Sequence, residues 1–351
     1  MRKPPTGPAG LLVLAALIAL SPFVSRAGSP SAADAESPYR AGVARITVQD
    51  AASGVVGFGD AQMLAVPFEV LVAYPTEVAE APFEAAPFTI RASLNAPIVA
   101  AKAFPVVLFS HGNGRGGTPL AERDLITSLA RQGFIVIAPF HSGTRPFWDR
   151  PRQLHKALDQ VLADPRFAAQ ADRSRLVIVG YSFGGAVALI AAGATPDFAH
   201  LVSYCRGRSD DPRACDGIDT NDTSHVILGQ AADVLPVKAL VLLEPFGAPF
   251  DRQALSSLTM PVLLYRAEHS DLRPEGNILA LAAALPRPPR QEIVPGGHLI
   301  FVAPCTPALV KEAPADCEAV AKDAAGVDGA AILRRVEAEV TDFLRKNLSA
   351  Q

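Results

Sequence analysis

The ten residues from Leu176 to Gly185 read Leu-Val-Ile-Val-Gly-Tyr-Ser-Phe-Gly-Gly. Four apolar residues lead into a Gly-x-Ser-x-Gly pattern, and an apolar, alanine-rich run follows over 186–192. This order is typical of a buried strand that turns sharply into a helix, where glycines leave room for the neighbouring chain. The pattern predicts that Ser182 is a catalytic nucleophile held at that turn, and the alternative is a structural turn serine.

Other short apolar runs have the same character as the one before Ser182. They occupy residues 105–109, 134–138, 239–243 and 262–265. Because they do not alternate between apolar and polar residues, we expect strands of a parallel sheet that is buried on both faces. Residues 43–48 and 68–74 alternate better, and this predicts antiparallel edge strands.

Helical patterns lie between the apolar runs, over residues 118–133, 151–163 and 328–348. Thr118 is expected to cap the first of these helices, and Asp328 to cap the last. Strands and helices that alternate in this way predict an α/β fold, with a mostly parallel, doubly wound sheet and helices on both faces.

The N-terminus has the pattern of a secretory signal peptide over residues 1–27. Arg2 and Lys3 precede an apolar stretch over 11–20, and small residues follow at Ser25 and Ala27. Ten apolar residues are too few to span a hydrocarbon layer of about 30 Å. We therefore expect a secreted or periplasmic protein with no stable membrane span after cleavage, the alternative being an uncleaved anchor.

The small, polar residues 28–40 predict a flexible leader, and 41–351 then form one large domain. Removal of residues 1–27 leaves 29 basic and 35 acidic residues, a net charge of −6. This balance argues against nucleic acid as a partner. The sequence does not indicate an oligomeric state.

Four cysteines form two pairs that are close in sequence, and export favours oxidised thiols. The simplest pairing is Cys205–Cys215 and Cys305–Cys317, although four cysteines allow three connectivities. A zinc site is the alternative, but separations of ten and twelve residues differ from the usual spacing of zinc ligands.

A serine hydroxyl needs a base, and the base needs a carboxylate to orient it. His298 is the expected base, because it follows the last apolar run and lies after the flexible pair Gly296-Gly297. Asp271, in the loop after 262–265, is the first choice for the acid. Glu244 is the second choice, and Glu268 also remains open.

Two backbone N–H groups are expected to stabilise an oxyanion. One belongs to Phe183, directly after the nucleophile. The other belongs to Asn113, in the glycine-containing stretch 110–114 after an earlier strand. The alternative for that stretch is a phosphate-binding loop, but no lysine or acidic partner follows at the required spacing.

Residues from about 195 to 235 interrupt the alternation with a polar segment that contains the first cysteine pair. Its position predicts a cap insertion over the site. The alternative is a surface excursion that does not contact substrate.

Together these segments resemble the α/β-hydrolase superfamily, and within it the dienelactone-hydrolase-like proteins related to platelet-activating-factor acetylhydrolases. The resemblance covers nearly the whole chain after residue 27. It rests on residues 70–76, 109–114, 149–153, 180–185, 266–268 and 297–305. The last of these resembles a family segment in which a disulfide, here Cys305–Cys317, ties down the histidine loop.

The chain departs from this family in two ways. Dienelactone hydrolases proper use a cysteine nucleophile, so opening of dienelactone rings does not follow for a chain with Ser182. Relatives have an aspartate where this chain has Ser270, with Asp271 next to it. Glu244 matches the acid of the platelet-activating-factor acetylhydrolases.

The resemblance implies a serine hydrolase that cleaves carboxylic esters of small or lipid-like molecules through an acyl-enzyme. No metal or organic cofactor is implied. A peptidase or amidase and an acyltransferase would share these residues. A binding protein with a hydrolase fold and no turnover is a further alternative.

Overall fold

The computed structural model describes residues 37–50, 67–100, 102–113, 117–141, 146–218, 220 and 234–349. The described residues all fall within one unit of the chain, Ser37–Gln351. The expected signal peptide, 1–27, and the expected leader up to residue 36 lie outside the described residues. None of the described helices combines the length and the apolar character needed to cross a membrane.

One sheet of ten strands runs through this unit, in the order β10-β9-β8-β7-β5-β6-β2-β1-β4-β3. The strands are β1 (Arg40–Val48), β2 (Phe68–Thr76), β3 (Ala81–Ala85), β4 (Phe88–Leu94), β5 (Phe104–Ser110), β6 (Ile135–Pro139), β7 (Ala171–Tyr181), β8 (Leu240–Leu243), β9 (Val262–Ala267) and β10 (Arg290–Val294). From β10 to β6 all neighbouring strands are parallel.

The predicted buried strands are β5 to β9, and their apolar residues are almost fully buried on both faces of the sheet. The first two strands are antiparallel, as predicted, but they are not at the edge of the sheet. The β3–β4 hairpin lies beyond them, and β10 forms the other edge. The strands β3, β4 and β10 were not predicted. β3 and β10 are short and largely exposed, and β4 mixes buried with exposed residues, so none of them carries an apolar run.

The helices are α2 (Arg123–Arg131), α3 (Pro146–Ala163), α4 (Phe183–Ala191), α5 (Phe198–Cys205), α6 (Pro212–Cys215), α7 (Ile278–Ala284), α8 (Pro307–Glu312), α9 (Pro314–Asp323) and α10 (Gly329–Ser349), with a 3₁₀ turn η1 (His298–Phe301). Asp328 caps α10, and its Oδ1 accepts a hydrogen bond from the Ala331 N–H. Thr118 does not cap α2. A turn closed by the Ala121 N–H and the Thr118 carbonyl comes first, and the helix begins one turn later.

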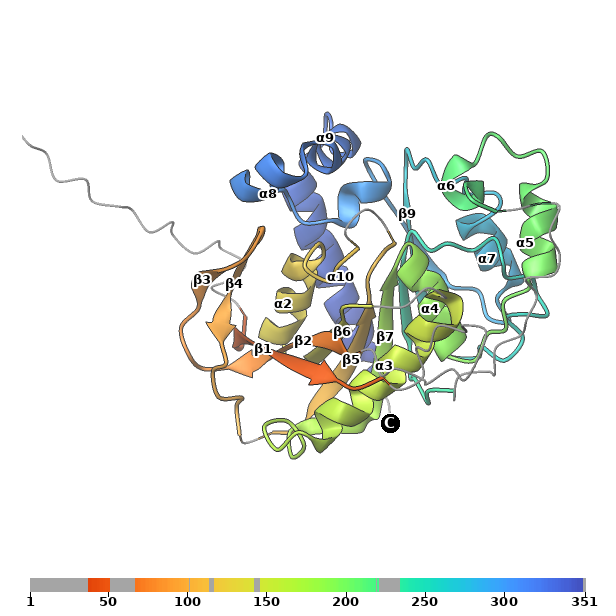
Figure 1. Ribbon diagram of the computed structural model, residues 1–351. Coiled ribbons are helices and arrows are strands. Elements are labelled where there is room, and N and C mark those ends of the chain that lie inside the picture. The colour runs from red at the N-terminus through yellow and green to blue at the C-terminus, as the bar shows by residue number, and fades with distance from the viewer. Residues whose placement is uncertain are drawn as a thin grey trace, which may run out of the picture. The chain divides into compact units, whose positions relative to one another are not determined.

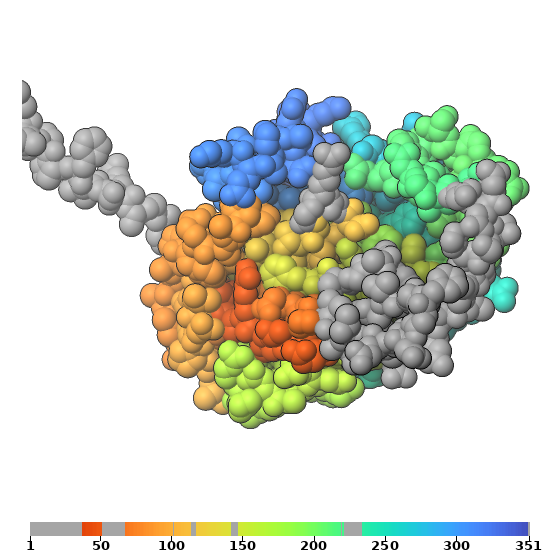
Figure 2. Space-filling view, viewed as in Figure 1, coloured from red at the N-terminus to blue at the C-terminus, as the bar shows by residue number. Residues whose placement is uncertain are grey.

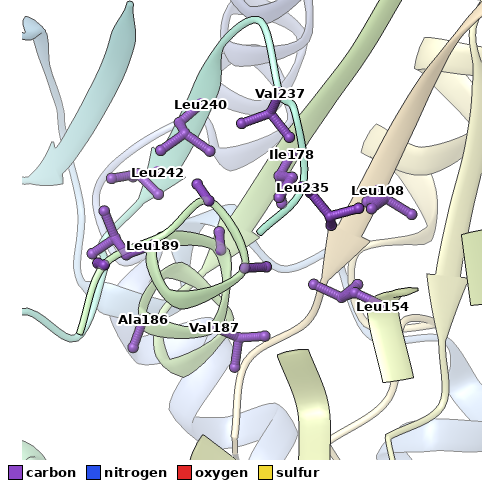
Figure 3. Close-up of a cluster of buried hydrophobic side chains, with 14 of the residues drawn as sticks. Leu108, Leu154, Ile178, Ala186, Val187, Leu189, Leu235, Val237, Leu240 and Leu242 are labelled. Atoms are coloured by element: carbon purple, nitrogen blue, oxygen red, sulfur yellow. The ribbon is translucent and has the colours of Figure 1, made fainter. Parts of the chain in front are cut away.

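Helices cover both faces of the sheet, so the predicted doubly wound architecture is present (Figure 1). One core lies under α3, α4 and α7, and a second core lies under α2 and α10. Figure 3 shows part of the first core, where Leu189 of α4 packs beside Leu240 and Leu242 of β8. The helix after Ser182 is therefore fixed by apolar burial along its length.

The core around Leu189 predicts a large effect of truncation. Leu189 is fully buried, so Leu189→Ala is expected to lower the free energy of unfolding by about 3 kcal/mol, through lost burial and a residual cavity. Leu279→Ala in α7 is the control: 42% of the Leu279 side chain is exposed, and its loss is expected to change stability by less than about 0.5 kcal/mol. Urea unfolding measures both, and equal losses would contradict this packing.

Candidate active site

Ser182 lies at a sharp turn whose close backbone contacts leave room only for glycine at positions 180 and 184. The serine has φ 52° and ψ −120°, between the end of β7 and the start of α4. A Cβ atom on Gly180 would lie 2.3 Å from the Gly184 carbonyl oxygen. A Cβ atom on Gly184 would lie 1.9 Å from the Ser110 carbonyl oxygen. The glycines predicted from the pattern are thus required by close backbone contacts.

His298 begins η1, with Nε2 2.9 Å from Ser182 Oγ. The positive φ of Gly296, 99°, turns the chain toward the sheet. Asp323 at the end of α9 then holds the loop, because its carbonyl accepts the Gly297 N–H and its Oδ2 accepts the Leu299 N–H. The Tyr181 hydroxyl donates to the His298 carbonyl at 3.0 Å. Sequence reasoning missed Asp323, which lies 25 residues after the histidine and follows no motif.

The structure brings Glu244, and not Asp271, to the histidine. Glu244 lies at the end of β8 with φ 46° and no exposed surface, and its Oε2 lies 3.1 Å from His298 Nδ1. The Ser270 hydroxyl donates to the same Oε2 at 2.5 Å, and the Ala267 N–H donates to Oε1. All of these contacts favour a fixed carboxylate directed at the imidazole.

The two other candidate acids lie elsewhere. Asp271 forms an ion pair with Arg213 of α6, and 58% of its side chain is exposed. The pKa of Asp271 is lowered, because the Arg213 guanidinium outweighs the effect of partial burial. Glu268 is exposed, and its N–H pairs with the Val294 carbonyl. Neither carboxylate is hydrogen-bonded to His298 in the described residues.

Arg150 of α3 contacts both residues that were predicted to supply oxyanion donors. Its guanidinium donates to the His111 carbonyl and to Asn113 Oδ1, each at 3.1 Å. The same guanidinium lies over the Phe183 ring, 5.2 Å from the centroid. Sequence reasoning used residues 149–153 only as part of a resemblance and assigned Arg150 no role. Its buried position suggests that it holds the two backbone segments in register.

His111 and His141 also end strands on this side of the sheet. Burial and the nearby Arg150 lower the pKa of His111 to about 3, and burial lowers the pKa of His141 well below its usual value. Both imidazoles are therefore neutral near pH 7. His141 bridges Ser110 Oγ and Gln153 Oε1, and His111 Nδ1 lies 2.7 Å from the Gly112 carbonyl. This arrangement supports the loop that carries Asn113.

Ser182 and His298 open into a cavity of about 310 Å³. One wall is apolar and comes from β4, η1 and the C-terminal helices; it consists of Phe88, Leu299, Val302, Leu309, Ala319 and Val320. The lining also includes polar residues, among them Asp316 of α9: Asn113, Thr118, Glu122, Arg123, Arg213 and Asp316. Within the described ranges, no group of three or more His, Cys, Asp or Glu side chains could hold a metal ion.

The helices α8 and α9, which contribute to the apolar wall, belong to a C-terminal segment that lies against β4 and α2. The Thr306 hydroxyl donates to the Pro87 carbonyl, and Arg123 donates to the Pro304 carbonyl. Figure 2 shows this C-terminal segment, in blue, against the orange surface of the β3–β4 hairpin. Cys305 and Cys317 form a disulfide that joins the start of the segment to α9. Sequence reasoning did not anticipate this wall.

Only part of the insertion over 195–235 lies within the described residues. Its described part contains α5 and α6, joined by the disulfide Cys205–Cys215, while residues 219 and 221–233 lie outside the described residues. Arg213 is the one described residue of the insertion that lines the cavity. Both predicted disulfides are present, so the zinc alternative for the cysteines does not apply.

Comparisons with known proteins identify the fold of the chain. No protein-family model and no curated protein matches the chain. Among solved structures, the chain is similar to a ferulic acid esterase from Streptomyces cinnamoneus, with a TM-score of 0.60 and 18% sequence identity over 90% of this chain and 92% of that one. At this identity the likeness shows the fold alone, which is the predicted α/β-hydrolase fold.

The contact at Gly184 predicts that this turn tolerates no side chain. Gly184→Ala is expected to destabilise the protein by about 3 kcal/mol or more, because the added Cβ meets backbone rather than a movable side chain. Gly329→Ala, at the start of α10, is the control. The nearest atoms to its added Cβ would lie 3.6 Å away, an ordinary van der Waals distance, and alanine favours helix. Thermal unfolding should show a clear drop for the first variant and none for the second. An unchanged midpoint for Gly184→Ala would contradict the tight turn.

Proposed function

We propose that the protein is a serine hydrolase that cleaves carboxylic esters through an acyl-enzyme. One observation carries this proposal: Ser182, His298 and Glu244 form a continuous hydrogen-bonded chain that opens into a cavity. Such a chain provides a nucleophile, a base and an orienting acid in the required order. The fold that the protein shares with a ferulic acid esterase agrees with this proposal.

In the proposed reaction, Ser182 Oγ attacks the ester carbonyl carbon, and His298 Nε2 takes the hydroxyl proton. Glu244 fixes the imidazole so that Nδ1 keeps its proton, and it stabilises the imidazolium. The N–H groups of Phe183 and Asn113 are the proposed donors to the oxyanion. The tetrahedral intermediate then expels the alcohol, which takes the proton from Nε2. Water repeats the sequence on the acyl-enzyme and releases the acid.

We infer that the substrate is a small or lipid-like ester, since the cavity offers an apolar wall beside Ser182. The site of action is proposed to be outside the cytoplasm, because the chain has a signal-like N-terminus and two disulfides. Membership of the dienelactone-hydrolase-like group remains a proposal. The placement of Glu244 supports the branch related to platelet-activating-factor acetylhydrolases, whose acid has the same position.

Hydrolysis of p-nitrophenyl esters from acetyl to palmitoyl tests the reaction class. The wild-type protein is expected to turn these esters over, and Ser182→Ala is expected to reduce kcat by about 10⁶-fold. Amide substrates run in parallel separate a peptidase or amidase, and an added alcohol that captures the acyl group identifies an acyltransferase. Absence of turnover, together with absence of covalent labelling of Ser182, would favour a binding protein.

The two candidate acids give opposite predictions. Glu244→Gln is expected to lower kcat by about 10⁴-fold, since an amide cannot stabilise the imidazolium and favours the wrong tautomer. Asp271→Asn breaks a half-exposed ion pair with Arg213 and removes a charge that makes no hydrogen bond to His298, so kcat is expected to stay within about threefold of the wild-type value. Circular dichroism shows whether each variant is folded. A large loss for Asp271→Asn with little loss for Glu244→Gln would transfer the role to Asp271.

A further inference from the structure

Besides Glu244, the acid of the proposed triad, the carboxyl-bearing residue Glu122 lies near the site, in the lining of the cavity that contains Ser182. Glu122 immediately precedes α2 and is 2% exposed, so it is shielded from bulk water. Among the described residues its Oε2 has no hydrogen-bond partner, although the backbone N–H groups of Gly112 and of Glu122 itself hydrogen-bond to the carboxyl group. The proposed triad does not use this group. A buried polar atom without a partner is costly and calls for an explanation.

The nearby arginines do not supply that partner. Arg123 donates its N–H groups to the carbonyls of Thr89, Leu120 and Pro304. Arg150 donates to the His111 carbonyl and to Asn113 Oδ1. Neither arginine forms an ion pair with Glu122 in the part of the chain that the structure describes. Glu122 is thus surrounded by cations whose hydrogen bonds are directed elsewhere.

Burial raises the pKa of Glu122 to about 8, although backbone N–H groups and the two arginines oppose this increase. The side chain is therefore mainly a neutral carboxylic acid at pH 7, and it has an O–H donor as well as acceptor oxygens. A carboxylic acid that burial keeps neutral is a known way to donate a hydrogen bond inside an active site.

We propose that Glu122 is a substrate-binding residue that donates a hydrogen bond from its carboxyl group to an oxygen atom of the substrate other than those of the reacting ester. The favoured substrates are then esters whose acyl or alkoxy chain carries an ether, hydroxyl or carbonyl oxygen. The apolar wall from β4, η1 and the C-terminal helices contacts the hydrocarbon part of the same chain. This inference rests on the proposed ester-cleaving function and names the substrate class for that site.

The test compares esters of equal length that differ by one atom. Pentyl pentanoate is the parent, and each analogue has one methylene of the acyl or alkoxy chain replaced by an ether oxygen. The measured quantity is the ratio of kcat/KM for the analogue to kcat/KM for the parent. Because the same two esters are used with every variant, their intrinsic reactivities cancel when ratios are compared between proteins.

For at least one analogue, this ratio is expected to fall about 10-fold in Glu122→Leu, which has no donor. Glu122→Gln is the matched control, because its amide N–H still donates and should preserve the ratio at pH 7. In the wild-type protein the ratio is expected to fall as the pH rises through about 8, since ionised Glu122 loses its donor. In Glu122→Gln the ratio should not change over that range.

Other titrating groups are present around the cavity, and the ratio separates them from Glu122. The charged or titratable groups that face Glu122 or share its cavity are Arg123, Arg150, Tyr181, Arg213, His298 and Asp316. A group that acts on the reacting ester changes turnover of parent and analogue alike, and its effect cancels in the ratio. A pH-dependent ratio that disappears in Glu122→Gln is therefore specific to the Glu122 carboxyl group.

Two results would overturn the inference: a ratio that is the same in Glu122→Leu and wild type for every analogue, or a pH-dependent fall that persists in Glu122→Gln. If Glu122→Leu does not fold, the pH profiles of wild type and Glu122→Gln decide alone. Failure of the proposed function looks different, because the wild-type protein would then hydrolyse neither the parent nor any analogue.

Discussion

The arrangement of the site depends on the interlocking of two adjacent turns, after β7 and after β8. Both turns contain a non-glycine residue at positive φ, Ser182 and Glu244. The Ser182 N–H donates to the Leu243 carbonyl, and the Ser182 carbonyl accepts the Phe246 N–H. Gly185 packs so closely on Pro245 that a Cβ atom would lie 2.6 Å from the proline ring. The proposed nucleophile and acid are therefore positioned by one backbone unit.

This interlocking explains why the strained conformations persist. A residue other than glycine that adopts a positive φ costs free energy. Such a conformation persists only where the surrounding structure imposes it. Here the surroundings are parallel strands buried on both faces and a helix, α4, that is buried from Gly184 to Leu189. The hydrophobic core thus holds the strained turns, while His298 reaches them on a separate loop that Asp323 fixes.

The sequence predicts those parts of this arrangement that have a recognisable pattern within a short run of residues. Buried strands have uninterrupted apolar runs, and the turn at Ser182 has a recognisable glycine pattern. Glu244, by contrast, competes in sequence with Asp271, and only the folded chain shows that its carboxylate lies against the imidazole of His298. Arg150 and Asp323 act through partners far along the chain, and no short-range pattern reveals such contacts. The β3–β4 hairpin was missed because β3 is largely exposed and β4 buries only part of its length, so neither strand has an uninterrupted apolar run.

The two disulfides have a consequence for how the protein depends on its redox surroundings. Cys205–Cys215 joins the end of α5 to α6, which carries Arg213, and Cys305–Cys317 joins the chain beyond His298 to α9, which contributes to the apolar wall. Neither disulfide touches the strands that carry Ser182 and Glu244. The second disulfide therefore bears on the cavity wall and on the His298 loop, which Asp323 of α9 holds, whereas Ser182 and Glu244 are fixed by backbone contacts at the ends of β7 and β8. The proposed base thus depends in part on a covalent cross-link, while the proposed nucleophile and acid depend on buried backbone contacts.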